Sequence, residues 1–282
     1  MDTLASIQHL ASITPRYTHG HFSFEFGNIE YVDAHTLEIQ YREIFLQGLY
    51  DIDIIPDGGR IVDCGANIGL SLIRYALRHP KCQVIGYEAD PQIFEVCLRN
   101  IKRLGLTNVD LICAAVGAHN GTESFIVEGG EGGRVSKEGT LVVPSIRLND
   151  IISEQAVDLL KLDIEGSEWI TLTDMCKSGI LSSINNLIVE FHGTDTWQRT
   201  LPEILISLSD AGFKYTFPWS FCEPGLAGRE EPTPYPFAPD GKYIMFLHAW
   251  RKEDVELSNN ESLSIPQLRY RSADIHECSI RS

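Results

Sequence analysis

The chain has 282 residues, 23 of them basic and 39 acidic, which gives a formal net charge of −16 at pH 7. Such a length suffices for one large α/β domain with additions, while the negative charge opposes binding to nucleic acid or to an anionic membrane surface. The sequence has no run of about eighteen apolar residues and does not begin with a basic segment before an apolar one. Its seven cysteines are scattered without a C-x-x-C pair, so we expect a cytoplasmic protein with reduced thiols.

Residues 1–57 are expected to form an appendage to the main domain. Two alternating runs, 22–26 and 29–32, flank Gly27-Asn28 and predict a β-hairpin. Residues 35–50 carry apolar side chains at helical spacing, which predicts a helix, and we expect it to lie across the mouth of a ligand site.

Residues 58–250 alternate between strand-like and helix-like segments, as in an α/β domain. Helices are expected over 67–79 and from Pro91 into 100–106. The expected strands are 60–63, 84–88, 109–116, 159–163, 187–191, 213–217 and 243–248. This order predicts a doubly wound, mostly parallel sheet with its ligands outside the carboxyl ends of the strands. The remaining residues, 251–282, are polar and form either a docked tail or a disordered one.

The turn after the first of these strands places two glycines where a nucleoside cofactor needs them. Gly65 and Gly69 allow close approach of the backbone, and the following helix offers unpaired N–H groups. Glu88 ends the next strand, where an acid accepts hydrogen bonds from ribose hydroxyls. A dinucleotide motif needs a third glycine, and Asp63 would repel phosphate but suits an ammonium and a sulfonium. We therefore expect S-adenosylmethionine as cofactor, although the glycines could merely cap a strand and Glu88 could be a solvated acid.

Acidic residues also gather at the ends of two later strands. Asp163 and Glu165 follow one strand, and Glu190 and His192 close the next. The dipole of the following helix would explain Glu165, but an acid that ends a central apolar strand, such as Asp163, should lie at the ligand edge of the sheet. We expect Asp163 and His192 to take a proton from an acceptor, with Glu165 and Glu190 in support. His192 could equally be a packing or capping residue.

Two irregular insertions are expected to border the acceptor cleft. One is the glycine-rich segment 128–133, which lies between two strand-like runs, and the other is the proline-rich and aromatic segment 218–239. A long connection of this kind suits a lid over an acceptor, and the alternative is a passive surface loop.

The order of these motifs resembles the FkbM-type family of class I S-adenosylmethionine-dependent methyltransferases. The resemblance covers about residues 60–217 and rests on the segments Asp63 to Gly69, Tyr87 to Pro91, Ala115 to Gly117, Leu148 to Ile151, Asp158 to Gly166 and Val189 to His192. It implies a Rossmann-like, seven-stranded sheet with six parallel strands and one antiparallel strand, and usually O-methylation of a sugar or polyketide hydroxyl. The residues expected to hold the cofactor are Asp63, Gly65, Asn67, Gly69, Glu88, Ala115 and Asp163.

The expected partner is therefore a small-molecule acceptor with a hydroxyl group. Some relatives that methylate sugars use magnesium, but here Phe191 rather than a second acid follows Glu190, so we expect no metal. Two alternatives stay open at this point, an NAD-dependent oxidoreductase on the same βαβ architecture and a non-catalytic S-adenosylmethionine-binding protein.

Overall fold

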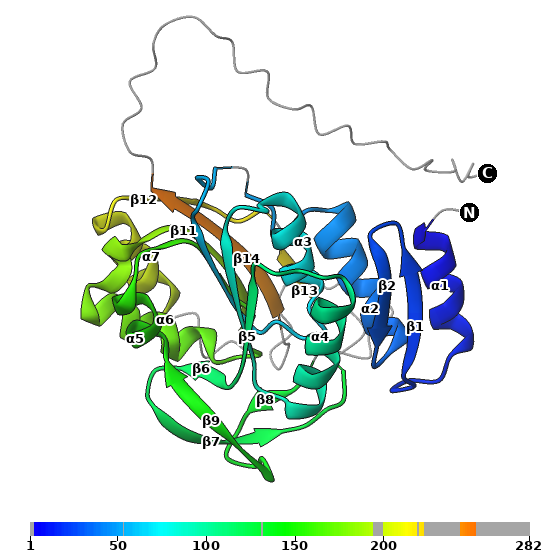
Figure 1. Cartoon of the computed structure of the whole chain (residues 1–282). Helices are drawn as coiled ribbons and strands as arrows, with labels where there is room; N and C mark the ends of the chain where they lie inside the picture. Colours follow the sequence, from blue (N-terminus) through cyan, green and yellow to red (C-terminus); the bar gives the residue numbers. More distant parts are fainter. Residues whose placement is uncertain are drawn as a thin grey trace, which may run out of the picture. The chain divides into compact units, whose positions relative to one another are not determined.

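Eight strands form the central sheet, in the order β12-β14-β11-β10-β3-β4-β5, with β13 paired to β14 (Figure 1). The structure, a computed structural model, describes residues 3–52, 54–130, 132–193, 200–218, 220–222 and 243–251. The strands are β3 (Arg60–Cys64), β4 (Gln83–Glu88), β5 (Val109–Cys113), β10 (Val157–Leu162), β11 (Ile184–Gly193), β12 (Phe213–Thr216), β13 (Ser220–Cys222) and β14 (Tyr243–Arg251).

The strand directions confirm the predicted sheet. Strands β5, β4, β3, β10 and β11 are parallel neighbours. Strand β14 is antiparallel to both β11 and β12, so β12 runs in the direction of the first five. A mostly parallel sheet of this kind must be covered on both faces, which explains why β3 is buried along its whole length and β10 at every residue except Asp158.

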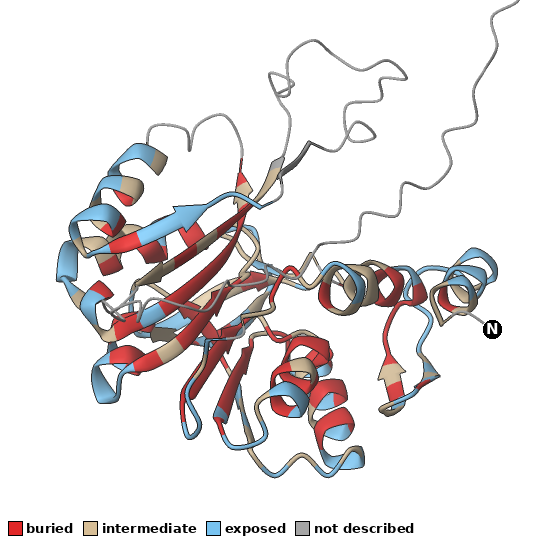
Figure 2. Cartoon of the chain, turned by 90° about the horizontal axis from the view of Figure 1, so that it is seen from above, coloured by how far each residue is buried: buried red, intermediate tan, exposed pale blue. Residues whose placement is uncertain are grey.

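Helices cover both faces of the sheet (Figure 1). Helices α3 (Leu70–Arg78) and α4 (Pro91–Arg103) lie on one side, and α5 (Leu148–Glu154), α6 (Glu168–Ser178), the 3₁₀ helix η2 (Ile180–Ser183) and α7 (Leu201–Asp210) on the other. Because side chains alternate along a strand, Ile61 packs in the core on the α3 and α4 side and Val62 in the core on the opposite side. Figure 2 shows the result, in which the central strands are mostly buried and the helices expose their outer faces.

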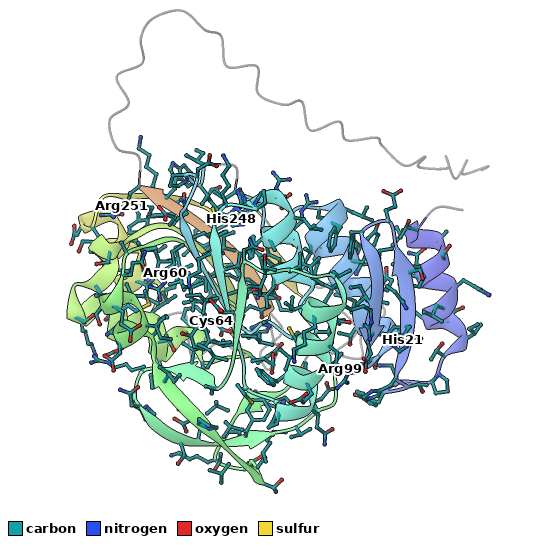
Figure 3. All side chains as sticks on the ribbon, in the orientation of Figure 1. His21, Arg60, Cys64, Arg99, His248 and Arg251 are labelled. Carbon is teal, nitrogen blue, oxygen red and sulfur yellow. The ribbon has the colours of Figure 1, made fainter. Side chains whose placement is uncertain are left out.

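Strand β3 is held in the interior along its whole length. Figure 3 labels its two end residues, Arg60 and Cys64, which are both buried. The guanidinium of Arg60 donates to the carbonyl oxygens of Ile151 and Gln155 at 3.1 and 2.7 Å. These bonds connect the start of β3 to α5. The other end of β3 continues into the glycine turn.

The N-terminal part comprises α1 (Thr3–Ile13), β1 (Gly20–Phe24), β2 (Gly27–Tyr31), α2 (Ala34–Tyr41) and the π-helix η1 (Arg42–Leu46). The predicted hairpin is confirmed, but its turn is Glu25-Phe26 rather than Gly27-Asn28, because Gly27 pairs with Phe24. Helix α1 was not predicted. The single helix expected over 35–50 is replaced by α2 and η1, followed by a turn in which Gly48 has a φ of +64°.

This N-terminal part is bonded to α4 of the main domain. The amide of Asn100 donates to the Glu30 carbonyl at 2.9 Å and accepts from the Glu30 N–H at 2.8 Å. Arg99 adds an ion pair to the Glu30 carboxylate at 2.7 Å. The bonds to Asn100 engage the backbone of β2, so they hold the hairpin in a defined position on α4.

A second, four-stranded sheet follows β5 in the sequence. Its order is β6-β9-β7-β8, with β6 at Ala115–Gly117, β7 at Gly121–Ile126, β8 at Arg134–Val135 and β9 at Leu141–Arg147. The prediction of one strand over 109–116 was therefore wrong. The chain leaves the main sheet at Ala114, whose N–H donates to the Glu88 carbonyl, and no glycine or proline in the apolar run signals this break.

Two predicted segments fall largely outside the described residues. Of the proline-rich segment 218–239, only Pro218 and the backbone of 220–222 are described, and the tail lies outside from residue 252 onward. The five cysteines whose side chains are described are free thiols. No helix among the described residues is both long and apolar enough to cross a membrane.

Candidate active site

A cavity of about 1180 Å³ opens at the carboxyl ends of β3, β4, β10 and β11. Residues from α2, η1 and the glycine-rich segment complete its wall, so the expectation that segment 128–133 borders the cleft is confirmed. Of the predicted site residues, those that line the cavity are Gly65, Asn67, Glu88, Ala115, Asp163, Glu165, Glu190 and His192. Asp63 and Gly69 do not line it.

The glycine turn brings the backbone to the cavity wall. Gly65 has a φ of +90°, and a Cβ there would lie 1.7 Å from the carbonyl oxygen of Asp163, so only glycine fits. Asn67 also has a positive φ, +47°, and its side-chain amide donates to the Gly130 carbonyl at 2.9 Å, which joins the turn to the glycine-rich segment. Gly69 serves packing instead, because a Cβ there would lie 2.7 Å from Cys97 Sγ on α4.

Glu88 lines the cavity with a buried carboxylate. One carboxylate oxygen accepts from the N–H of Asn67 and the other from the N–H of Asp90, both at 2.8 Å. Burial raises the pKa of Glu88 to about 7, against the lowering effect of these two N–H groups. Each carboxylate oxygen keeps a further lone pair, so the group can accept two more hydrogen bonds from vicinal hydroxyls.

Asp90, which the sequence analysis did not single out, also lines the cavity. Its Oδ1 caps α4 by accepting from the N–H groups of Gln92 and Ile93. Its buried Oδ2 has no hydrogen-bond partner among the described residues. Because a buried acceptor is rarely left unpaired, this atom marks a place where a bound ligand can supply a donor. The Asp-Pro pair at a helix start signalled the cap but not this second role.

Asp63 has a different role from the expected one. It is fully buried, accepts from the hydroxyl of Ser71, and forms an ion pair with Lys161 Nζ at 3.0 Å. Lys161 is the residue directly opposite Asp63 on β10, so the two side chains share one face of the sheet. The ammonium group that the sequence analysis assigned to a ligand is thus supplied by the chain itself.

Lys161 connects this buried pair to the cavity. Its ammonium also donates to the Gly65 carbonyl at 3.0 Å and lies 3.2 Å from Asp163 Oδ2. Burial alone would lower the pKa of Lys161, but the charges of Asp63 and Asp163 outweigh it and raise the pKa. Lys161 therefore stays a cation that fixes the turn on one side and Asp163 on the other.

His192 lies among three acids. Its Nδ1 donates to Glu168 Oε1 at 3.1 Å, and its Nε2 lies 3.6 Å from Glu165 and 3.7 Å from Glu190. Burial alone would lower the pKa of His192, but the charges of Glu168, Glu165 and Glu190 raise it well above its usual range. The imidazolium form is thus favoured near neutral pH, and this opposes the expected action of His192 as a base.

The same cluster meets the spacing of a cation site. One ligand atom each from Asp163, Glu165 and His192 lies within 4.8 Å of the others.

Comparisons with known proteins point to one family. A profile of the methyltransferase FkbM domain matches residues 63–215, which is more than half of the chain. The methyltransferase sdnD of Sordaria araneosa is 26% identical over 235 residues, which cover 68% of this chain and 88% of that protein. The 31-O-demethyl-FK506 methyltransferase FkbM of Streptomyces tacrolimicus is 24% identical over 227 residues, which cover 66% of this chain and 85% of that protein.

Solved structures align with the chain at low sequence identity. The N-terminal domain of EvdMO1 with S-adenosylhomocysteine bound aligns with a TM-score of 0.45 and 15% identity, and covers 89% of this chain and 98% of that one. TYW2 of M. jannaschii in complex with S-adenosylmethionine aligns with a TM-score of 0.44 and 14% identity, and covers 85% of this chain and 90% of that one.

The match to the FkbM domain decides between the alternatives of methyl transfer and NAD-dependent oxidoreduction. The residues present fit the methyl donor, since Gly65 places backbone on the cavity wall, Glu88 can accept from two hydroxyls, and the buried Asp90 Oδ2 can accept from a ligand donor. The chain belongs to the FkbM family of methyltransferases, and its cofactor is S-adenosylmethionine.

Proposed function

We propose that the protein transfers the methyl group of S-adenosylmethionine to a hydroxyl of a small molecule, a sugar or another natural product. The observation that carries the proposal is the position of Asp163. This residue comes directly after β10, the neighbour of the strand that leads into the glycine turn, and its carboxylate lines the cavity 3.2 Å from Lys161 Nζ. One relative is named a 31-O-demethyl-FK506 methyltransferase, and this methylation of an oxygen supports the same reaction here.

For the cofactor we propose two contact regions on the cavity wall. Glu88 accepts from the ribose hydroxyls, with Asn67, Asp90 and Ala115 beside the nucleoside. Gly65 and Asp163 border the methionine end. Asp63 and Gly69 act from behind the wall, Asp63 through Lys161 and Gly69 by packing against α4.

Bound S-adenosylmethionine supplies an electrophilic methyl carbon. The chain holds the acceptor oxygen in line with it, and such positioning supplies much of the rate enhancement. Asp163 accepts the hydroxyl proton as the acceptor oxygen attacks. His192, as an imidazolium, holds Glu165 and Glu190 in place and offsets their charge. The base role expected of His192 therefore falls to Asp163.

The proposal is tested by screening hydroxylated sugars and small natural products for release of S-adenosylhomocysteine. With an acceptor in hand, Asp163→Asn is expected to slow turnover by ~10²–10⁴-fold, the usual loss on removing a general base, while S-adenosylhomocysteine affinity changes little. Asp110→Asn is the matched control, because Asp110 is exposed on β5 and does not line the cavity. Full turnover by Asp163→Asn would refute the assignment of the base.

A further inference from the structure

Tyr50 reaches the acids of the active site from the N-terminal part of the chain. It precedes the segment that matches the FkbM domain, residues 63–215, and the sequence analysis gave it no role. Its side chain is buried and lines the cavity. It is thus a group at the reaction site that the family match does not cover.

The hydroxyl of Tyr50 bridges two acids from neighbouring strands. It donates to Glu190 Oε2 in a short hydrogen bond and lies 3.3 Å from Asp163 Oδ2. Two carboxylates this close repel each other, and a hydroxyl between them can donate to either one. The position of each carboxylate therefore depends on the phenol between them.

The ring of Tyr50 is fixed by its own contacts. Lys161 Nζ lies 4.9 Å from the ring centroid, on the side of the buried ion pair. The ring of Phe246 on β14 packs against it at 5.7 Å between centroids. Both contacts involve the aromatic ring and neither needs the hydroxyl.

The backbone beside Tyr50 is held on both sides. On one side His248 of β14, labelled in Figure 3, donates from Nε2 to the Leu49 carbonyl at 2.7 Å. On the other side Asp51 forms an ion pair with Arg74 of α3 at 2.6 Å. These bonds connect the segment to both β14 and α3, so the phenol is placed before any ligand arrives, as an efficient site requires.

Asp163 and Glu190 lie among other charged groups, so the position of the Tyr50 hydroxyl between them affects both acids. Burial, and then the charges of Asp163 and Glu43, raise the pKa of Glu190 well above its usual range. The ionisable groups that face the two acids are Lys161 and Asp63 from β10 and β3, His192 from β11, Glu165 from the turn after β10, Glu43 from η1, Tyr75 from α3, and Tyr50 itself. Within this set, Tyr50 is the group that contacts Asp163 and Glu190 at the same time.

We propose that Tyr50 is a positioning residue for methyl transfer, whose hydroxyl holds Asp163 and Glu190 in the orientation that aims Asp163 at the acceptor. The N-terminal part then completes the active site of the FkbM domain. This inference rests on the proposed function, in which Asp163 is the base.

The test compares Tyr50→Phe with Tyr75→Phe. Tyr50→Phe keeps the ring against Lys161 and Phe246 and removes only the hydroxyl. Tyr75 is an equally buried tyrosine whose hydroxyl has no hydrogen-bond partner among the described residues, so Tyr75→Phe controls for the loss of a buried phenol. Steady-state rates are measured across the pH range with the acceptor found in the screen, and S-adenosylhomocysteine affinity is measured by calorimetry.

Tyr50→Phe is expected to lower kcat by about tenfold or more, since small misplacements of a reacting group can cost ~10²-fold in rate. The pH dependence of kcat should also differ from that of wild type, because Glu190, which lies beside the base, loses the hydroxyl that donates to it. The acceptor KM and the S-adenosylhomocysteine affinity should stay near wild type, and Tyr75→Phe should match wild type throughout. An unchanged S-adenosylhomocysteine affinity in Tyr50→Phe would show that the cavity of the variant is folded.

A second measurement needs no acceptor. In protein with ¹³C-labelled carboxyl groups and S-adenosylhomocysteine bound, Tyr50→Phe should change the titration curve of Glu190, assigned with Glu190→Gln, and Tyr75→Phe should not. Wild-type curves in Tyr50→Phe, or a wild-type kcat profile in Tyr50→Phe while Asp163→Asn is slow, would overturn the inference and leave the proposed function intact. Full turnover by Asp163→Asn would instead remove the proposed function itself.

Discussion

Lys161 Nζ lies 3.0 Å from Asp63 Oδ1, and both side chains are at most 2% exposed. The two residues are direct neighbours on the parallel strands β10 and β3. Because Lys161 also donates to the Gly65 carbonyl and contacts Asp163, one buried cation connects the cofactor turn to the proposed base. The conformation of the turn and the position of Asp163 therefore depend on the same ion pair.

Removing one partner of this ion pair should destabilise the fold. Lys161→Met keeps much of the side-chain volume but leaves Asp63 buried without its cation, a change that typically costs about 3–5 kcal/mol. Urea denaturation measures the loss in the free energy of unfolding. The double variant Asp63→Asn, Lys161→Met should recover part of it, since no uncompensated charge remains. A loss under about 1 kcal/mol in the single variant would show that the pair is not coupled in this way.

Gly65→Ala should prevent cofactor binding. The added Cβ would lie 1.7 Å from the Asp163 carbonyl oxygen, at a φ of +90°. Gly58→Ala is the matched control, because Gly58 has a similar φ of +80° with no atom within 4 Å of the added Cβ. The control should lose only about 1–2 kcal/mol of stability from its backbone strain and retain binding. Equal effects in the two variants, by thermal unfolding and by S-adenosylhomocysteine calorimetry, would mean that strain alone matters.

Glu88→Gln should weaken S-adenosylhomocysteine binding by about tenfold or more, because hydrogen bonds to a charged acceptor contribute about 1.5–3 kcal/mol. The amide keeps the volume of the side chain but donates where the carboxylate accepts. The control variant Glu95→Gln changes an exposed residue of α4, the helix that follows Glu88 in the chain, and should bind S-adenosylhomocysteine normally. Calorimetry that finds wild-type affinity for a folded Glu88→Gln variant would contradict the ribose assignment.

Cofactor affinity should also depend on pH. Burial raises the pKa of Glu88 from 4.5 to about 7, so the folded protein without ligand favours the neutral carboxylic acid. The stability that this protonated Glu88 contributes is lost as pH rises from about 4.5 through 7. Ribose hydroxyls prefer the carboxylate, so S-adenosylhomocysteine should bind more tightly at pH 8 than at pH 6 and stabilise the protein more there. Calorimetry at both pH values should show this difference in the wild type and a smaller one in Glu88→Gln.

Local sequence patterns were sufficient for most strands of the central sheet and for the glycine turn. Gly65 and Glu88 lie on the cavity because each follows a buried apolar strand, and the carboxyl ends of parallel strands meet at one edge of the sheet. The break at Ala114 was missed because nothing in a continuous apolar run distinguishes one sheet from the next.

The side-chain partners required the tertiary structure. Asp63 and Asp163 both follow apolar runs, and the sequence by itself determined only that both lie near the ligand edge. Asp63 turns to Lys161 and away from the cavity because parallel pairing places the two residues opposite each other, a register that the sequence does not state.

Tyr50 lies 113 residues before Asp163 and 140 before Glu190, so its contact with both acids depends on the docking of the N-terminal part against β14 and α3. The sequence thus determined which strands and turn border the cavity, through local hydrophobic periodicity and glycine geometry. The tertiary structure alone decided which charges face each other there, because the pairing of ionisable groups depends on packing between segments far apart in the chain.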